Sequence, residues 1–238
     1  MSSSLTVSAD EDGTIALKVV MLGEMSTGAK TSLALRYIKG EFRDFVEPTI
    51  GAAFLVKRTT LDGIDFKLEL WGLFFYHLHS LHYADCLCSN SLTYTDCAGQ
   101  ERYKSLAPMY YNGAAIAIVG FDITSSPSLD VAFRWLDELS RQGPPDAVIA
   151  LVGNKIDLAN QRKVEANDVC ERLSESFPSV LYYETSAKTG EGVNELFESV
   201  LRRWIEYHSS NDNAGGDDET KHKEAGRKKK NKEDCIIC

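Results

Sequence analysis

The sequence predicts an α/β fold in which a mostly parallel six-stranded sheet is covered by helices on both faces. Strand-like and helical segments alternate along the chain, which is the pattern of repeated β-α-β units. Several strand-like segments, such as 115–121, are apolar throughout, as expected where helices cover both faces of a parallel sheet. With 238 residues, 43% of them hydrophobic, the chain can form one substantial core.

Six strands are predicted from apolar segments bounded by turn-forming residues, at 15–22, 52–61, 66–71, 114–122, 148–154 and 181–185. Helical periodicity occupies intervals between them, at 31–39, 128–141, 166–176 and 193–207. In such a sheet ligands bind at the carboxyl ends of the strands, so the segments that follow those ends are candidates for a functional site.

Composition divides the chain into three parts. Residues 1–14 are predicted to be a flexible extension, 15–208 a folded domain and 209–238 a flexible tail, because the end of the chain is polar and then basic. The formal net charge of −9 argues against nucleic acid as a partner. The segment 221–232 nevertheless carries seven basic residues against one acidic residue.

Neither a membrane span nor a secretory signal is predicted. The longest apolar run, Gly113 to Ile123, is shorter than the ~18 residues that a membrane-spanning helix needs. The start, Met1 to Asp12, lacks the basic and apolar regions of a signal peptide. We therefore expect a cytoplasmic protein with six reduced cysteines.

The first predicted strand runs into a glycine-containing segment and then a helix: Gly23-Glu24-Met25-Ser26-Thr27-Gly28-Ala29-Lys30-Thr31-Ser32. This is nearly GxxxxGK[ST], the P-loop, whose backbone N–H groups surround phosphates while a lysine neutralises them and a hydroxyl binds Mg²⁺. Lys30 follows Gly23 by seven positions instead of six. Either Met25 is the extra residue and Ala29 replaces the last glycine, or Ala29 itself is inserted. The segment could also be an ordinary strand–helix turn.

Two further segments follow predicted strand ends. Asn154, Lys155 and Asp157 follow one strand, and Glu184-Thr185-Ser186-Ala187-Lys188 closes the next. A carboxylate such as Asp157 can accept two hydrogen bonds, and guanine offers a ring N–H beside an amine, whereas adenine does not. After a phosphate loop, these segments predict a site that selects GTP over ATP.

The segment 96–103 offers three groups that phosphoryl transfer needs. Asp96 can join a metal shell, the N–H of Gly99 can meet a terminal phosphate, and the amide of Gln100 can orient water.

In these segments the chain resembles the Ras superfamily of small GTPases, specifically the Rab proteins of early endosomes. The resemblance rests on segments 49–54, 67–71, 96–103, 105–111 and 154–157, in family order, and covers about residues 15–207. It implies the Ras-like form of the P-loop NTPase fold, with 15–208 as a GTP-binding domain.

The resemblance also implies roles for individual residues. Phosphates would be bound by the loop, namely Gly23, Ser26, Thr27, Gly28, Ala29, Lys30, Thr31 and Ser32, with Gly99. Mg²⁺ would be held by Thr31 and Thr49, and through water by Asp96, while Gln100 would position the attacking water. The guanine would be bound by Phe42, Asn154, Lys155, Asp157, Ser186, Ala187 and Lys188.

The implied partners are an exchange factor, an activating protein, a prenyl chaperone, and effectors that read Phe54, Trp71 and Tyr110. The C-terminal Cys235-Ile236-Ile237-Cys238 has the form C-a-a-X behind a basic segment. One lipid chain with a basic patch, or two lipid chains, gives stable anchoring. We therefore expect lipidation at Cys235, with Cys238 as a second candidate, on the cytosolic face of endosomal or other vesicle membranes.

The 24 residues 72–95 interrupt the resemblance, because in the family the metal-shell aspartate directly follows the strand-ending tryptophan. Three interpretations stay open. His77, His79, His82, Cys86 and Cys88 could form a metal site, although their spacing matches no standard pattern. The segment could be a functional inserted loop, or a translated, unspliced intron.

The function predicted is that of a membrane-anchored switch that hydrolyses GTP and regulates vesicle trafficking. The alternative is a Rab-like binding protein that holds nucleotide weakly, because of the lengthened loop and the insertion. An ATP-driven enzyme is disfavoured by Asp157.

The intron hypothesis predicts that most mature transcripts lack 72 bases, three for each of the 24 residues of 72–95. Sequencing the transcript tests it, and a message that keeps those bases in most copies would refute it.

Overall fold

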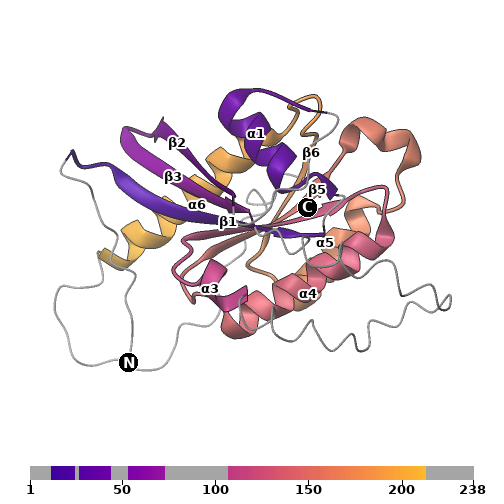
Figure 1. Cartoon of the computed structure of the whole chain (residues 1–238). Coiled ribbons are helices and arrows are strands. Elements are labelled where there is room, and N and C mark those ends of the chain that lie inside the picture. Colours follow the sequence, from indigo (N-terminus) through magenta and orange to yellow (C-terminus); the bar gives the residue numbers. More distant parts are fainter. Residues whose placement is uncertain (1–11, 25–26, 44–52, 73–106, 213–238) are drawn as a thin grey trace, which may run out of the picture.

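The computed structural model describes residues 12–24, 27–43, 53–72 and 107–212 (Figure 1). Its six strands form one sheet in the order β2-β3-β1-β4-β5-β6. The strands are β1 Ile15–Gly23, β2 Ala53–Leu61, β3 Ile64–Gly72, β4 Ile116–Asp122, β5 Val148–Asn154 and β6 Leu181–Thr185. All neighbouring pairs are parallel except β2 with β3. The predicted mostly parallel, six-stranded α/β sheet is therefore confirmed.

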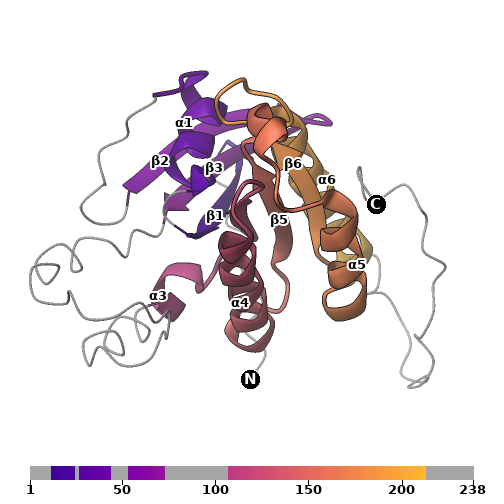
Figure 2. The same ribbon diagram turned by 90° about the vertical axis from the view of Figure 1, so that its right-hand side faces the viewer.

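The helices lie on both faces of the sheet, as predicted. They are α1 Thr31–Lys39, α3 Ala107–Tyr111, α4 Ser126–Gln142, α5 Ala166–Ser176 and α6 Val193–Asp212, with a 3₁₀ segment, η2, at Ile156–Gln161. One buried cluster joins α1 and α6 to the sheet, and a second joins α3, α4 and α5 to its other face. Figures 1 and 2 show α1 and α4 on opposite sides of the strands.

Strands β2 and β3, the last two at one side of the sheet, form a hairpin because a short turn joins them. Asp62 and Gly63 have φ values of 52° and 80°, and Leu61 pairs with Ile64 directly across the turn. Two consecutive residues with positive φ are typical of a tight turn whose twist matches that of antiparallel strands. This turn produces the one antiparallel pair of the described sheet.

Several boundaries differ from the prediction. The short α3 and η2 were not predicted, because neither has enough turns for a hydrophobic period to be recognised. The last helix runs from Val193 to Asp212 and is therefore longer than the predicted 193–207. Cys170 of α5 is disulfide-bonded, so the expectation of reduced thiols is wrong for this cysteine.

The helix that follows the glycine-containing loop is fixed to the sheet by aromatic packing. Tyr37 of α1 stacks on Phe197 of α6, with ring centroids 3.7 Å apart and planes 6° from parallel. Both rings are buried, and Phe197 is 0% exposed. On the strand side, Phe66 meets Trp204 edge to face at 6.0 Å. These contacts hold α1, and with it the end of the loop, against the rest of the fold.

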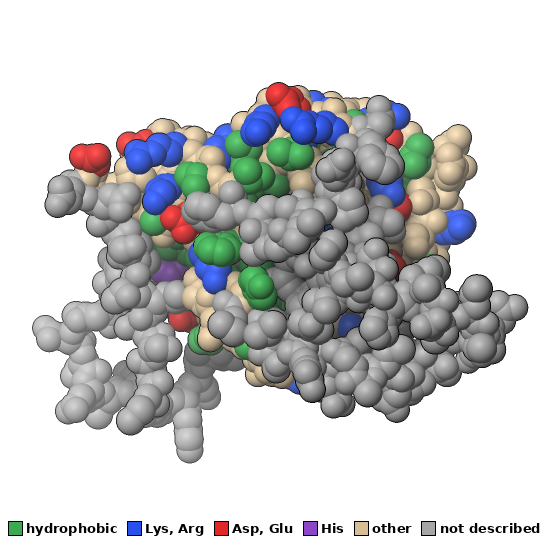
Figure 3. Space-filling model, viewed as in Figure 1, with side chains coloured by type: hydrophobic (Ala, Val, Ile, Leu, Met, Phe, Trp, Pro, Cys, Tyr) green, Lys and Arg blue, Asp and Glu red, His purple; other side chains and the backbone are tan. Residues whose placement is uncertain are grey.

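The described helices include none that is long and apolar enough to span a membrane. On the face shown in Figure 3, basic and acidic side chains intermingle along the upper edge, where α1 lies in Figure 1. The basic segment 221–232 lies outside the described residues.

Phe197→Ala should lower the free energy of unfolding by about 3–5 kcal/mol, because it removes a fully buried ring and leaves a cavity beside Tyr37. Arg202→Ala on the same helix removes only an exposed ion pair with Asp62 and should cost less than about 1 kcal/mol. Denaturant unfolding of both variants measures the difference. Equal losses would show that the α1–α6 contact contributes little.

Candidate functional site

The carboxyl ends of the parallel strands meet at one edge of the sheet. Strand pairing places Gly23 beside Gly120, Asp122 beside Asn154, and Asn154 beside Thr185. The segments that follow β1, β5 and β6 therefore come together, although more than 100 residues separate the first from the others. This is the edge at which parallel α/β sheets bind ligands.

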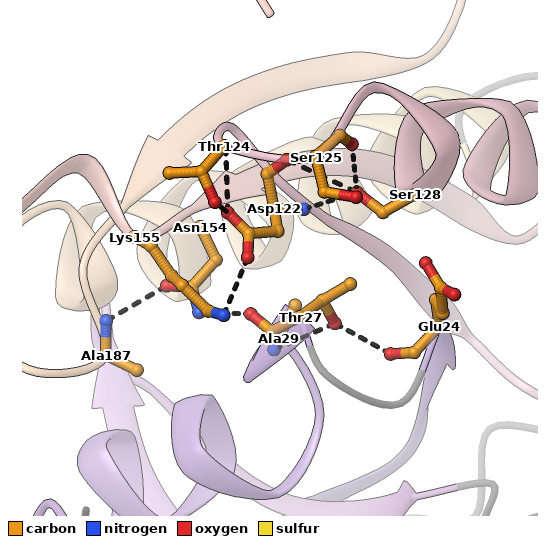
Figure 4. Close-up of polar contacts among 10 residues, drawn as sticks. All are labelled: Glu24, Thr27, Ala29, Asp122, Thr124, Ser125, Ser128, Asn154, Lys155 and Ala187. Atoms are coloured by element: carbon orange, nitrogen blue, oxygen red, sulfur yellow. Dashed lines mark hydrogen bonds and ion pairs between the residues drawn. The ribbon is translucent and has the colours of Figure 1, made fainter. Parts of the chain in front are cut away.

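Asn154 links these segments directly (Figure 4). Its side chain is buried, and its Nδ2 donates to the carbonyl of Thr27, 2.8 Å away, across 127 positions of sequence. Its Oδ1 accepts hydrogen bonds from the backbone N–H of Ala187 at 3.0 Å and from the hydroxyl of Thr185 at 3.3 Å. One amide thus fixes the loop after β1 relative to the segment after β6.

The loop after β1 is closed by its own polar groups. The buried hydroxyl of Thr27 donates to the carbonyl of Glu24 at 2.8 Å and accepts from the N–H of Ala29 at 3.3 Å. Gly28 has a φ of +67°, and a Cβ there would lie 3.0 Å from Nδ2 of Asn154. Glycine is required at this position by both its conformation and the close approach of Asn154.

Lys30 lies under this loop. Its Nζ donates to the carbonyl oxygens of Gly23 at 2.7 Å and Glu24 at 2.8 Å, and the residue is only 6% exposed. Burial lowers the pKa of Lys30 to about 8, partly opposed by the carboxylate of Glu24. A phosphate beside Nζ would favour the charged form, so this lysine is suited to neutralising a bound anion.

Lys155 is placed by an unusual backbone conformation. Its φ of 72° is left-handed, and its Nζ forms an ion pair of 2.6 Å with Asp122 at the end of β4. The second carboxylate oxygen of Asp122 accepts hydrogen bonds from the N–H and the hydroxyl of Thr124 (Figure 4). Left-handed backbone in a residue other than glycine is costly and is often found at functional sites.

The carboxylate predicted to recognise a base is oriented by a neighbouring loop. Ser186 donates from its hydroxyl to Oδ1 of Asp157 at 2.5 Å, and the same hydroxyl accepts from the N–H of Thr189 at 3.1 Å. Asp157 itself is exposed at the start of η2. A fixed, solvent-facing carboxylate can accept hydrogen bonds from two adjacent N–H groups of a ligand.

Arg36 of α1 clamps the loop after β6. Its guanidinium donates to the carbonyl oxygens of Ala187 at 2.8 Å, Lys188, and Gly40 at 2.6 Å. Gly40 ends α1 in a left-handed conformation with a φ of 68°. Arg36 therefore connects the end of α1, two residues before Phe42, to the segment predicted to bind a base.

A second arginine holds the base-recognition segments together. Arg162, just after η2, makes a bidentate ion pair with Glu184 of β6, with both N–O distances at 2.7 Å. The hydroxyl of Tyr182 also donates to this carboxylate, at 2.8 Å. The hydrogen bond to Glu184 raises the pKa of Arg162, and bidentate geometry makes such a pair strong and specific.

The structure thus brings together most of the predicted binding residues from three parts of the chain, namely Gly23, Thr27, Gly28, Ala29, Lys30, Thr31, Ser32, Asn154, Lys155, Asp157, Ser186, Ala187 and Lys188. The others lie outside the described residues: Ser26, Thr49, Asp96, Gly99, Gln100, Cys235 and Cys238, as do the five residues of the hypothetical metal site, His77, His79, His82, Cys86 and Cys88.

The remaining predicted residues are only partly located. Phe42 is half-buried and packs against the cluster that holds α1. Strand pairing sets Phe54 opposite Trp71 in the β2–β3 hairpin. Tyr110 of α3 is half-buried against the other cluster. Contact of Phe42 with a base and recognition of the three aromatic residues by effectors stay predictions.

Sequence reasoning missed Asp122, Arg36 and Arg162, and it placed Glu184 in a strand-end segment without giving it a role. Only Asp122 carried a usable signal, because it ends the predicted strand 114–122 at the same sheet edge as the motifs. The others act through contacts between distant segments, for which a single sequence contains no local pattern.

This geometry combines a buried lysine, Lys30, under a tight loop at a helix start with an oriented carboxylate, Asp157, that follows β5 at the same edge of the sheet. The first part suits a phosphate, and the second suits a base with adjacent N–H donors. Comparison with known proteins agrees: a family model described as the Ras family matches residues 18–73 and 85–206. The chain therefore belongs to the Ras family and is a small GTPase.

Its relatives include Rab5 proteins from distant organisms. It is 45% identical to the Ras-related protein Rab-5A of Dictyostelium discoideum over 186 residues, which are 78% of this chain and 79% of the relative. It is 45% identical to the GTP-binding protein ypt5 of Schizosaccharomyces pombe over 192 residues, 80% and 78% of the two chains. The Ras-related protein Rab5 of Nicotiana tabacum is 43% identical over 186 residues, again 78% of this chain and 80% of the relative. These relatives identify the chain as similar to Rab5 within the family.

Arg36→Ala should speed release of bound guanine nucleotide about tenfold or more, because it removes charged hydrogen bonds that hold the loop carrying Ala187 and Lys188. Arg43→Ala is the matched control, since Arg43 is exposed and forms an ion pair with the exposed Glu41. Stopped-flow release of a fluorescent GDP analogue measures both rates. Equal rates for the two variants would show that the clamp does not support the binding site.

Proposed function

We propose that this small GTPase binds GTP with Mg²⁺ at the carboxyl edge of its sheet, hydrolyses it to GDP and phosphate, and regulates early endosomal vesicle trafficking. The observation that carries the proposal is the linkage made by Asn154. It joins the loop that ends in Lys30 to the segment that contains Ala187, within the same edge as Asp157. In this proposal, the same amide holds the phosphate site and the guanine site at a fixed distance from each other.

In this proposal each segment has a separate task. Lys30 and the N–H groups at the start of α1 neutralise the phosphates, since a helix start and a buried ammonium both favour anions. Thr31 is the first residue of α1, and its hydroxyl, with Thr49 and Asp96, would supply the hard oxygen ligands that Mg²⁺ prefers. When bound, the ion would neutralise charge on the phosphates.

In the hydrolysis step, Gln100 would orient the attacking water molecule, and the N–H of Gly99 would contact the terminal phosphate. No arginine finger is evident in the sequence, so intrinsic hydrolysis should be slow and an activating protein should raise its rate by roughly 10³ to 10⁵.

Single-turnover hydrolysis by Gln100→Ala should be slower than by the wild type at equal GTP occupancy. Equal rates would remove Gln100 from this role.

Asp157→Ala should weaken GTP binding about 100-fold and leave ATP binding almost unchanged, because the hydrogen bonds that only guanine can donate are lost. Competition of labelled GTP by GTP and by ATP, on purified protein with Mg²⁺, measures the preference. Asp168→Ala, an exposed aspartate of α5, is the control and should keep the wild-type preference.

An unchanged preference in Asp157→Ala would contradict the assignment of the guanine site. If wild-type protein that has been incubated with GTP and Mg²⁺ leaves a desalting column without nucleotide, the whole proposal fails and the nucleotide-weak alternative replaces it.

The C-terminal cysteines are proposed to anchor the protein to the cytosolic face of an endosomal membrane. A prenyl group at Cys235, with Cys238 as a second candidate, would act together with the basic segment 221–232. Exchange factor, activating protein, prenyl chaperone and effectors are the partners that such a switch requires. Mass spectrometry of the C-terminus from cells tests the anchor, and an unmodified terminus refutes it.

We propose that 72–95 interrupts the family pattern. Strand β3 ends at Gly72, and the family match omits 74–84 of this segment while it includes 72–73 and 85–95. Retaining the segment between β3 and Asp96 costs loop-closure entropy, so we expect weaker binding of GTP than in a chain lacking 72–95. Equal affinities of the two chains would refute this expectation.

A further inference from the structure

The loop between Gly23 and Lys30 is one residue longer than the GxxxxGK spacing, and the structure describes its residues 23–24 and 27–30. Ala29 is 0% exposed, so its methyl group points into the fold instead of toward a ligand. Its N–H donates to the hydroxyl of Thr27 at 3.3 Å, as Figure 4 shows. This N–H is used inside the loop and not for a phosphate.

The space that receives the methyl group of Ala29 exists because residue 120 has no side chain. Gly120 lies in β4, between Val119 and Phe121, both fully buried. A Cβ on Gly120 would lie 2.0 Å from the Cβ of Ala29, a distance that side chains cannot adopt. Gly120 is not among the glycines with positive φ, so its backbone conformation would accept alanine. Glycine is required here by space and not by conformation.

The start of the loop packs on the same residue. Gly23 is paired with Gly120 in the sheet and has a φ of +132°, and a Cβ on Gly23 would lie 2.2 Å from the carbonyl oxygen of Gly120. Both ends of the loop therefore approach the backbone of β4 at one point.

The residues after Ala29 return to positions that suit phosphate binding. Lys30 directs Nζ to the carbonyl oxygens of Gly23 and Glu24. The N–H of Leu33 donates to the carbonyl of Gly28 at 3.1 Å, a span of five residues, whereas an α-helical hydrogen bond spans four. This widened turn absorbs one residue and keeps Gly28 next to the start of α1.

We propose that Gly120 is a positioning residue for nucleotide binding: its missing side chain lets Ala29 fold inward, so that a lengthened loop still presents Lys30 and the start of α1 to phosphates. The inference rests on the proposed guanine-nucleotide site.

The test is a double-mutant cycle on the full chain, with Gly120→Ala, Ala29→Gly and the combined variant. Gly120→Ala should release a fluorescent GDP analogue about 10 to 100 times faster than the wild type, because an overpacked contact displaces the loop. In the combined variant the new Cβ would face the Cα of residue 29 at 3.3 Å, which a small shift can relieve. Its release rate should therefore lie within about threefold of that of Ala29→Gly alone.

Gly153→Ala in β5 is the matched control. Gly153 is also a strand glycine without positive φ, and a Cβ there would meet side chains of the core, namely Phe121 at 3.0 Å, Ile123 at 3.1 Å and Tyr182 at 3.3 Å. Because none of these belongs to the loop, Ala29→Gly should not reverse any effect of Gly153→Ala.

The outcomes separate this inference from the function on which it rests. Wild-type release by Gly120→Ala, or no recovery in the combined variant, overturns the inference while the wild-type protein still binds nucleotide. A wild-type chain that holds no guanine nucleotide overturns both. If Gly120→Ala does not fold, recovery of a folded, nucleotide-loaded combined variant supports the inference, and an unfolded combined variant overturns it.

Discussion

The site depends above all on the buried amide of Asn154. Its donor side holds the carbonyl of Thr27, and its acceptor side holds the N–H of Ala187 and the hydroxyl of Thr185. A buried amide must satisfy these groups within the protein, because leaving one unpaired costs about 1–3 kcal/mol. Satisfying them fixes the loop after β1 and the segment after β6 relative to each other, so the same hydrogen bonds that stabilise the fold also set the distance between the proposed phosphate and base sites.

A second layer of charged groups supports this amide. Asp122 holds Lys155 in a strained conformation, Arg36 clamps the carbonyl oxygens of the loop after β6, and the Arg162–Glu184 pair connects η2 to β6. The two ion pairs, Asp122–Lys155 and Arg162–Glu184, are largely or partly shielded from water, where Coulomb interactions are weakened less than at an exposed surface. The binding edge is thus assembled from segments that have little regular structure of their own but are fixed by side chains of helices and strands.

The lengthened loop shows how a departure from a motif can be compatible with function. An extra residue in a phosphate loop could redirect an N–H away from the ligand, and the N–H of Ala29 is indeed used within the loop. The effect of the extra residue is confined to this N–H, because Ala29 turns toward β4, where Gly120 leaves room for its methyl group. Interiors are close-packed, so an added methyl group requires such a matched space. Whether a phosphate loop with one extra residue is compatible with phosphate binding therefore depends on the strand against which the loop packs.

By itself the sequence determined the fold class, most strand and helix positions, the family, and the segments proposed to bind nucleotide, because these follow from hydrophobic periodicity and from short motifs at strand ends. Only the tertiary structure decided how those segments are joined. The contact of Ala29 with Gly120 spans 91 positions, and the hydrogen bond of Arg36 to the carbonyl of Lys188 spans 152. Neither leaves a local pattern, because the space around a side chain and the carbonyl oxygens within its reach are set by elements that meet only when the chain folds.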